Sequence, residues 1–403
     1  MNLRQALIWL NVAAVFAVVV IITIRVISLR RNPEPAEPQN KTPFLPDEDL
    51  EGRKLERVLG WSLLFTVVIA IALPVYFLVE PDRQVAAEND FDEQAVERGA
   101  ALFANAQSEA FDPTVSLLCA DCHGVDGQGG STTFTIEPES LECDLDAEIT
   151  EETAEECRPM QVTWQAPPLD VALLRYPEEQ VTEIITFGRP GTPMPAWGVE
   201  SGEGVLNEQG IEDLVAYIES IQITPAEAKE RFSTDAIRER AEGAVADAEA
   251  ALAEAEAALA AAPPDGVEDA QAAVDAADAE LALVAAENER VQAAREGELV
   301  FESQCARCHT KGWSFFDPLN PDAAPAPGPA GGGAFGPNLT DGSELRQFPG
   351  PTGIEDQILF VAQGVAPHKA YGVRGISTGR MPFFNQILSE EQIAAVVEYE
   401  RGL

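Results

Sequence analysis

The pentapeptide Cys119-Ala-Asp-Cys122-His123 recurs, with one substitution, as Cys305-Ala-Arg-Cys308-His309. A helical pattern leads into each copy, and another follows each copy, at residues 207–222 and 389–401. A single C-x-x-C-H can arise by chance, whereas two copies in matching positions form a specific signal. The chain therefore contains a duplicated unit. We place the two units at residues 90–222 and 293–403.

The spacing inside each motif suits covalent attachment of haem. Residues i and i+3 share one face of a helix, so the two thiols can bond the two vinyl groups of one haem, and the next histidine can point back to the iron. A zinc site would need about four ligands, yet the chain holds 3 histidines. A thioredoxin-like redox motif has no use for the histidine. The sequence thus predicts two covalently bound haem c groups, held by Cys119, Cys122, His123, Cys305, Cys308 and His309.

Haem iron takes a further ligand, and three methionines besides Met1 are available. Met194 lies in a Met-Pro loop shortly before the closing helix of the first unit, and Met381 lies in the matching loop of the second. These parallel positions predict both as iron ligands and leave Met160 as a structural residue. His368 is the rival ligand in the second unit. Bis-histidine ligation there would lower the potential, because thioether sulfur favours ferrous iron.

The other two cysteines, Cys143 and Cys157, lie in an acid-rich stretch of the first unit, at residues 131–160. We expect this stretch to be irregular. In an oxidising compartment the two thiols would form a structural disulfide, for which the chain-entropy model gives about 3 kcal/mol. A Ca²⁺ site among the carboxylates is an alternative, but no regular ligand loop is visible.

Two uncharged apolar stretches precede the duplicated units, at residues 6–24 and 60–79. At a rise of about 1.5 Å per residue, each comes close to spanning a hydrocarbon core of about 30 Å. We therefore predict membrane helices at residues 1–29 and 60–80, with Pro74 kinking the second. A cleaved signal peptide is the alternative for the first stretch, but no small-x-small cleavage site follows it.

The loop between these helices, residues 30–59, is rich in basic residues, whereas Arg4 alone precedes the first helix and Arg83 closely follows the second. Because positively charged loops stay on the cytoplasmic side, we predict a cytoplasmic loop. Everything after about residue 80 would then lie on the extracytoplasmic side of the cell membrane. The basic residues of the loop are Arg30, Arg31, Lys41, Arg53, Lys54 and Arg57.

Residues 224–292 separate the two units and are rich in Ala, Glu and Asp. Thr224-Pro-Ala-Glu227 is a capping box with proline at N1, so we expect a long helix to begin there. Apolar residues seven apart on both sides of residues 263–266 predict an antiparallel, coiled-coil hairpin. We interpret it as a spacer, with a partner-docking surface as the alternative. A hairpin returns the chain to its starting point, so the flanking units can touch. The heptad residues are Val245, Leu252, Leu259, Val267, Val274 and Leu281.

The composition is that of a globular protein, with 46% apolar and 23% charged residues, but the net charge is -42. Such an acidic surface repels a phosphate backbone, which excludes nucleic acid as a partner. It could steer a basic redox partner or reflect an acid-rich proteome, and charge alone does not separate these readings. The predicted fold is mainly α, with two N-terminal transmembrane helices, two haem domains and an intervening hairpin.

The haem motifs, the proline-containing turns at residues 167–169 and 336–339, the Met-Pro loops and the closing helices resemble class I cytochromes c. The resemblance covers residues of about 90–222 and 293–403. It implies that the carbonyl of a turn proline, Pro168 in the first unit and Pro337 in the second, orients the proximal histidine by accepting its Nδ1–H.

Two such domains behind membrane helices look like the dihaem cytochrome c subunits of respiratory complexes, either the actinobacterial cytochrome bcc subunit or the dihaem subunit of cbb3-type oxidases. The N-terminal helices depart from the C-terminal anchor of the first, and the hairpin departs from both. The resemblance implies single-electron transfer between a quinol-oxidising complex and a terminal oxidase, through Fe(II)/Fe(III) couples and without independent substrate chemistry. The alternatives are an electron-relay subunit of a substrate dehydrogenase and a dihaem cytochrome c peroxidase, which needs an open coordination position.

Overall fold

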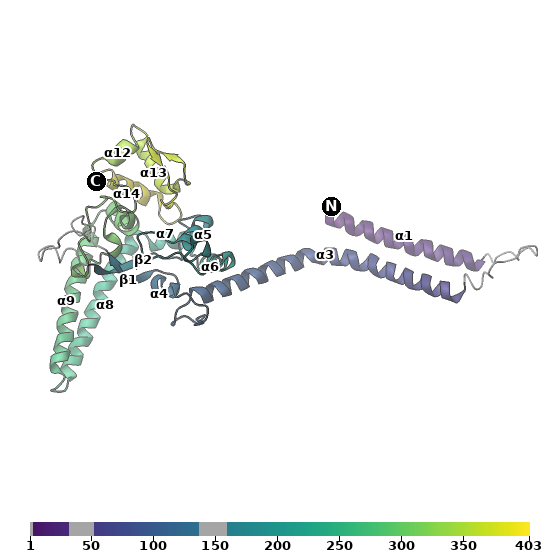
Figure 1. Cartoon of the computed structure of the whole chain (residues 1–403), viewed down its shortest axis with the longest axis horizontal. Coiled ribbons are helices and arrows are strands. Elements are labelled where there is room, and N and C mark those ends of the chain that lie inside the picture. Colours follow the sequence, from purple (N-terminus) through teal and green to yellow (C-terminus); the bar gives the residue numbers. More distant parts are fainter. Residues whose placement is uncertain (1–2, 32–51, 137–158) are drawn as a thin grey trace, which may run out of the picture. The chain divides into compact units, whose positions relative to one another are not determined.

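The computed structural model describes residues 3–31, 52–136 and 159–403 (Figure 1). The chain is mainly helical, as predicted, and divides into two compact units, Met1–Glu93 and Gln94–Leu403. The segment predicted as the cytoplasmic loop and the two cysteines Cys143 and Cys157 lie largely or wholly outside the described residues. The disulfide therefore stays a prediction.

The first unit contains α1 (Leu3–Arg31) and most of α3 (Arg53–Phe103). We expected a membrane helix ending at residue 80 and a separate helix from about residue 91, and this was wrong, because α3 is one helix of 51 residues that runs through Pro74 and Pro81. The segment that joins its two parts has no glycine before Gly99 and is rich in helix-forming Ala, Glu and Gln. These residues carry the helix through Pro81.

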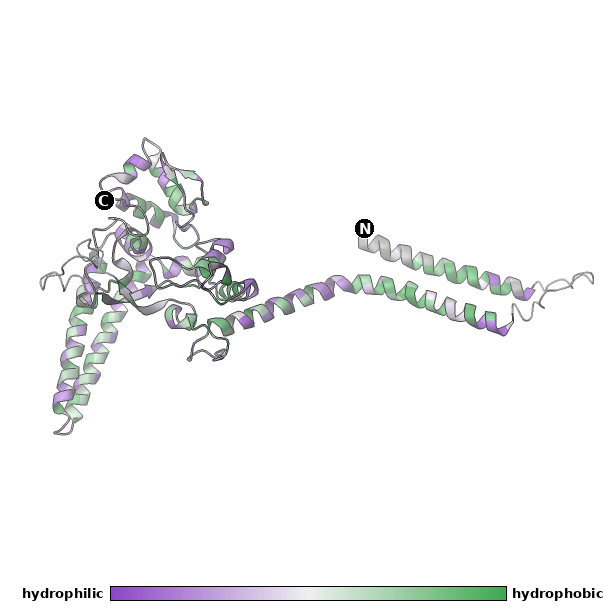
Figure 2. Ribbon diagram, viewed as in Figure 1, coloured by the Kyte–Doolittle hydropathy of each residue, from purple (hydrophilic) through white to green (hydrophobic). Residues whose placement is uncertain are grey.

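By length and composition, α3 is the one helix among the described residues that could cross a membrane, and α1 contains a shorter apolar segment, Val15–Ser28. Figure 2 shows that apolar residues cover the first part of α3, whereas its second part is mixed. Large apolar side chains of the first part, such as Phe65 and Phe77, are exposed. The structure thus contains one candidate span, and the second predicted span is not confirmed.

Domain 1 lies in the second unit and is built around the crossing of the end of α3 with α6. A Cβ on Gly99 of α3 would lie 1.9 Å from the carbonyl oxygen of Asp213, so the two backbones approach too closely for any residue but glycine. Next to this crossing, the rings of Phe103 and Tyr217 are 5.1 Å apart. The other elements of the domain are α4 (Cys119–His123), β1 (Gly130–Ile136), β2 (Met160–Ala166), α5 (Glu178–Phe187), the 3-10 helix η2 (Val199–Ser201) and α6 (Glu208–Ser220).

Domain 2 repeats this crossing with α10 (Glu296–Val300) and α14 (Glu390–Glu400). A Cβ on Gly297 would lie 2.1 Å from the carbonyl oxygen of Ala395, and the rings of Phe301 and Tyr399 are 5.3 Å apart. The duplication seen in the sequence is therefore a duplication of packing. The remaining elements are the π-helix η3 (Phe301–Cys305), α11 (Ala306–His309), η4 (Trp313–Phe315), η5 (Pro321–Ala323), α12 (Ser343–Gln347), α13 (Gly353–Gln363), β3 (Ala370–Tyr371) and β4 (Gly375–Ile376).

The acid-rich stretch of domain 1 is not irregular at its ends, contrary to our expectation. β1 and β2 form an antiparallel pair in which Gly130 faces Ala166 and Ile136 faces Met160. Both strands contain β-branched and aromatic residues, which favour extended pairing. The pair brings together the two ends of the segment that carries Cys143 and Cys157.

The linker between the domains begins with α7 (Pro225–Arg231) and continues as the hairpin of α8 (Thr234–Ala261) and α9 (Val267–Ala293). The capping box at Thr224 is present, but the prediction that one long helix starts there was wrong. Ser233 accepts a hydrogen bond from the N–H of Ala236 and starts a new helix. α8 and α9 pack against each other side by side, as Figure 1 shows. The heptad pattern as a coiled coil stays a prediction.

The two domains and the linker share packing within the second unit. Val171 and Leu174 of domain 1 and Ala228 of α7 join the apolar core of domain 2, which is built on Phe301, Ile387 and Val396 among others. Arg231 of α7 also forms a two-bond ion pair with the buried Asp170, at 2.8 and 2.9 Å. The haem domains are therefore held together by a continuous core.

Candidate haem-binding sites

In domain 1, the haem motif lies on the short helix α4. His123 is 9% exposed, and its Nδ1 lies 3.0 Å from the carbonyl oxygen of Pro167. A carbonyl can only accept, so Nδ1 carries the proton and donates it. In the neutral imidazole, Nε2 then keeps its lone pair, which is the form that binds a metal.

Domain 2 repeats this arrangement on α11. His309 is 6% exposed, and its Nδ1 donates to the carbonyl oxygen of Pro337 at 2.9 Å. Gly336 lies against the imidazole, because a Cβ there would be 2.7 to 3.0 Å from three ring atoms. The N–H of Gly336 also donates to the carbonyl of Cys308 at 2.7 Å. The ring is thus held in one orientation by backbone on two sides.

The hydrogen bond that we assigned to Pro168 is made instead by the preceding residue, Pro167, and this is a correction to the prediction. The signal for the correct residue was present in the sequence. Pro337 stands two residues before Leu339, and in domain 1 it is Pro167 that stands two residues before Leu169. The Pro-x-Leu spacing therefore identifies the acceptor, whereas the mere presence of proline does not.

Burial lowers the pKa of both histidines, while the hydrogen bonds to the proline carbonyls act in the opposite direction. The positive charge of Arg307 lowers the pKa of His123 further. Since the ordinary pKa of histidine is already about 6.5, both rings are neutral at pH 7. Neutral imidazole is the protonation state that ligation requires.

The four motif cysteines form no disulfides. Burial raises the pKa of Cys119 to about 12, and it raises the pKa of Cys305 well above its ordinary value. Redox-active C-x-x-C pairs depend on a lowered thiol pKa, so these pairs do not suit thiol–disulfide exchange. No set of three or more Cys, His, Asp or Glu side chains within the described ranges is grouped to hold a metal ion. The residues present fit covalent haem attachment better than either alternative.

The two Met-Pro loops have the same backbone setting. Gly188, which ends α5, and Gly364, which ends α13, both have positive φ and both lie against the carbonyl oxygen of the loop methionine. A Cβ would be 2.8 Å from that oxygen of Met194 in the first loop and 3.3 Å from that of Met381 in the second. The two loops therefore share this backbone contact, while ligation by the two methionines stays a prediction.

The other candidate ligands are placed differently. Met160 lies on β2 and is 42% exposed. His368 is exposed, has a φ of 62°, and its N–H donates to the carbonyl of Ser377 at the start of the β3–β4 pair. Nothing in this turn parallels the two Met-Pro loops.

Both haem motifs lie close to the contact between the domains. Trp164 of β2 contacts Phe315 and Phe335 of domain 2, with ring centroids 5.8 and 6.2 Å apart. Trp164 stands three residues before Pro167, and Phe335 stands two residues before Pro337. The two histidine–proline pairs are therefore joined by a short path through one aromatic contact, which single-sequence reasoning did not foresee.

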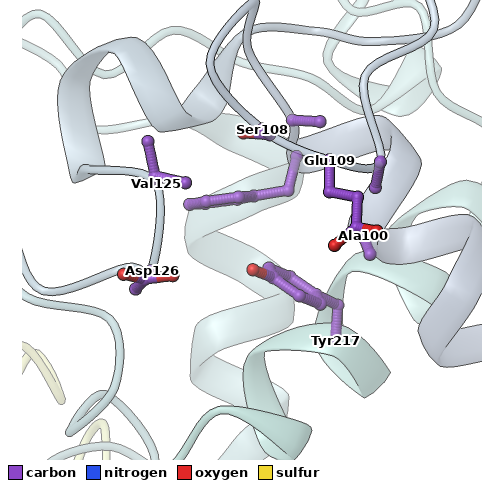
Figure 3. Close-up of a pocket in the computed structure, with 9 residues that line it drawn as sticks. Ala100, Ser108, Glu109, Val125, Asp126 and Tyr217 are labelled. Atoms are coloured by element: carbon purple, nitrogen blue, oxygen red, sulfur yellow. The ribbon is translucent and has the colours of Figure 1, made fainter.

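A small cavity of about 180 Å³ lies elsewhere in domain 1, beside Phe103 and Tyr217 (Figure 3). Its lining includes Ser108, Glu109 and Asp126 but neither His123 nor Met194. Ligand sites usually exceed about 300 Å³. This cavity is therefore separate from the haem motif and too small for a typical ligand.

Glu400, at the end of α14, is a buried acid next to the second haem motif. It accepts a hydrogen bond from Nε2 of Gln357 at 3.1 Å. Burial first, and then the negative charge of Glu344, raise the pKa of Glu400 from 4.5 to about 8. Between pH 4.5 and about 8, the folded chain keeps a proton on Glu400 that the unfolded chain releases. The free energy of unfolding therefore falls as the pH rises through this range.

A Glu400→Gln variant is expected to lose this part of the pH dependence, because glutamine does not titrate. Denaturant unfolding of the wild type and the variant between pH 4.5 and 8 measures the difference. Glu398→Gln, an exposed glutamate on the same helix, is the matched control and should follow the wild type. Parallel profiles for wild type and Glu400→Gln would show that Glu400 titrates normally.

Each half of the second unit is thus a small helical domain, in which a histidine with a free Nε2 follows two thiols on one turn. Residues 96–222 match the family described as Cytochrome c, and residues 292–399 match the family described as Cytochrome C oxidase, cbb3-type, subunit III. The chain therefore contains two cytochrome c domains, which carry covalently bound haem c with its iron and serve haem-based electron transfer. Searches of the curated proteins and of the solved structures gave no match.

Proposed function

We propose that this chain is a membrane-anchored dihaem cytochrome c that passes single electrons between a quinol-oxidising complex and a terminal oxidase. The observation that carries the proposal is the match of domain 2 to the cbb3-type subunit III family. That name belongs to the family, and it supports an oxidase as the partner here. The haem iron supplies the redox change, and the chain's own residues attach, orient and bury it.

The contact between the domains supports transfer within the chain. His123 and His309 are each bonded to a proline carbonyl, and the segments that carry these prolines meet at Trp164 and Phe335. Because the domains share one core, their spacing is fixed. An electron received by one domain then has the other domain as its nearest acceptor.

The proposed ligand sets are His123 with Met194 and His309 with Met381. The thioether attachments are Cys119 and Cys122 in domain 1, and Cys305 and Cys308 in domain 2. Two complete sets leave no open position for a peroxide, which favours a relay over a peroxidase.

The proposed topology has two membrane helices, formed by α1 and the first part of α3, and haem domains on the extracytoplasmic side. The basic residues between the helices support a cytoplasmic loop. In wall-stripped intact cells, an added protease should then spare residues 32–58 and cleave the haem domains. Cleavage within that loop would contradict the proposed topology.

Co-purification tests the assignment of partners. Mild detergent extraction of native membranes, followed by capture through a tag on this chain, is expected to retain subunits of a quinol-oxidising complex or of a terminal oxidase. The captured material should reduce oxygen when given a quinol. Capture of a substrate dehydrogenase alone, with no quinol oxidation, would assign the chain to that class instead.

A further inference from the structure

Three arginines gather at the contact between the domains, next to both haem motifs. Arg175 and Arg189 come from domain 1, and Arg307 is the third residue of the haem motif of domain 2. Burial lowers the pKa of Arg307, and the positive charges of Arg175 and Arg189 lower it further, so both of these guanidinium groups lie within electrostatic reach of Arg307. We call these three residues the arginine cluster.

The contacts of the cluster cross the domain boundary in both directions. Arg307 of domain 2 donates to the carbonyl of Gln165, two residues before the proline that holds His123. Arg175 of domain 1 lies over the ring of Phe384, at 5.3 Å from its centroid, and its own carbonyl accepts from the N–H of Phe383 at 3.0 Å. Each domain therefore places an arginine against the other.

The arginines of each domain also lie near the haem attachment residues of the other domain. Arg307 lies within electrostatic reach of His123 in domain 1, and Arg175 lies within reach of Cys305 in domain 2. Arg189 stacks on Tyr176, with its guanidinium carbon 5.5 Å from the ring centroid. The cluster is thus shared by the two sites and does not belong to one domain.

Within the described part of the chain the cluster has no acidic partner, although acidic residues outnumber basic ones by 68 to 26 in the sequence. Among the ion pairs formed within the described ranges, none includes Arg175, Arg189 or Arg307. The Nε atom of Arg175 is buried without a hydrogen-bond acceptor. A partly buried charge without a partner is destabilising, so this arrangement calls for an anion that the residues described by the structure do not supply.

We propose that Arg175, Arg189 and Arg307 form an anion-binding cluster, shared by the two domains, that holds the carboxylate side chains of the bound haems. The planar guanidinium fork matches a carboxylate with two parallel hydrogen bonds, which makes arginine the suitable residue for this ligand. Haem attached at either motif brings such carboxylates into the protein. The inference rests on the two attached haems and is independent of which donor and acceptor they serve.

The cluster also affects the redox equilibrium of both haems. Positive charge near the iron disfavours the ferric state, which carries one more positive charge than the ferrous state. Removing one guanidinium also leaves a carboxylate without its partner, and that change acts in the same direction. Loss of an arginine therefore lowers the midpoint potentials.

The test is an optical redox titration of the full-length holoprotein in detergent, with Arg307→Gln and Arg175→Gln as separate variants. Each is expected to shift the reduction equilibrium of both haems at least tenfold toward the ferric form, which is about 59 mV for one electron. Arg307→Lys keeps the charge and should recover most of this shift. Arg346→Gln is the control, because Arg346 is exposed and donates only to the carbonyl of Asp341 in its own domain.

Three outcomes would overturn the inference. The first is a pair of unchanged potentials in both variants with covalent haem intact, which would leave the proposed relay untouched. The second is a shift confined to one haem, since a shared cluster must act on both. The third concerns a free anion: if added inorganic phosphate at constant ionic strength lowers the wild-type potentials, and Arg307→Gln abolishes that response, phosphate and not haem carboxylate fills the cluster.

Discussion

Replacing Met381 with histidine is expected to lower one of the two midpoint potentials by on the order of 100 mV and to leave the other unchanged. The physical reason is the nature of the ligand atom, because thioether sulfur is soft and favours ferrous iron, whereas imidazole nitrogen favours ferric iron. Axial ligation spans about 0.8 V among haem proteins, so the shift should exceed that of any single surface charge. The proposal that Met381 is a ligand depends on this result.

An optical redox titration of the full chain measures both potentials at once. Met194→His is the counterpart and should lower the other potential. Met160→His is the matched control, because Met160 is exposed on β2 and lies outside the Met-Pro loops. Equal potentials in the wild type and Met381→His would exclude Met381 as a ligand and leave His368 as the candidate ligand.

A Gly297→Ala variant is expected to destabilise domain 2 by about 3 kcal/mol or more. The added Cβ would stand 2.1 Å from the carbonyl oxygen of Ala395 and 3.0 Å from the Cβ of Tyr399, so α10 and α14 must move apart. That movement opens the core around Phe301, which is 1% exposed. For a domain of this size, the melting temperature should fall by roughly 10–20 °C.

Scanning calorimetry measures the change, and Gly243→Ala is the matched control. Gly243 is also within a helix, but a Cβ there would meet nothing within 4 Å. Alanine at an open helix position should stabilise the protein by about 0.5–1 kcal/mol. If both substitutions raised the melting temperature, the close helix crossing would not exist in the folded protein.

Much of the local structure could be predicted because its signals are local. The closing helices were expected at residues 207–222 and 389–401, and they are α6 (Glu208–Ser220) and α14 (Glu390–Glu400). The turn at residues 263–266 separates α8 from α9 as expected. In each case a side-chain cap, a proline or a glycine fixes the boundary within a few residues.

The errors arose where two local signals competed. The end of the apolar stretch near residue 80 suggested the end of a helix, but the helix-forming residues that follow continue α3 to Phe103. At residues 224–234, a strong first cap hid a second one at Ser233, so one helix was expected where there are two. In the acid-rich stretch, the many charged residues led us to expect irregular structure, although β-branched residues favour the strands β1 and β2.

The contacts between the domains were not predictable from the sequence alone. Arg307 and Gln165 are 142 positions apart, and Gln180 and Gly379 are 199 positions apart. No periodicity or motif links residues at such separations. The arginine cluster became visible only when the fold had brought the two haem motifs to one boundary.

The two arms of the hairpin are tied to each other at its base. Arg238, near the start of α8, donates to the carbonyl of Ala294, just beyond α9, and Gln292 donates back to the carbonyl of Arg238. Adding or deleting whole turns in both arms together therefore changes only how far the tip extends, and the register of the two cytochrome c domains stays as it is. The exposed connector at residues 263–265 is accordingly a permissive position for grafting a fluorescent reporter or an affinity handle onto the working protein.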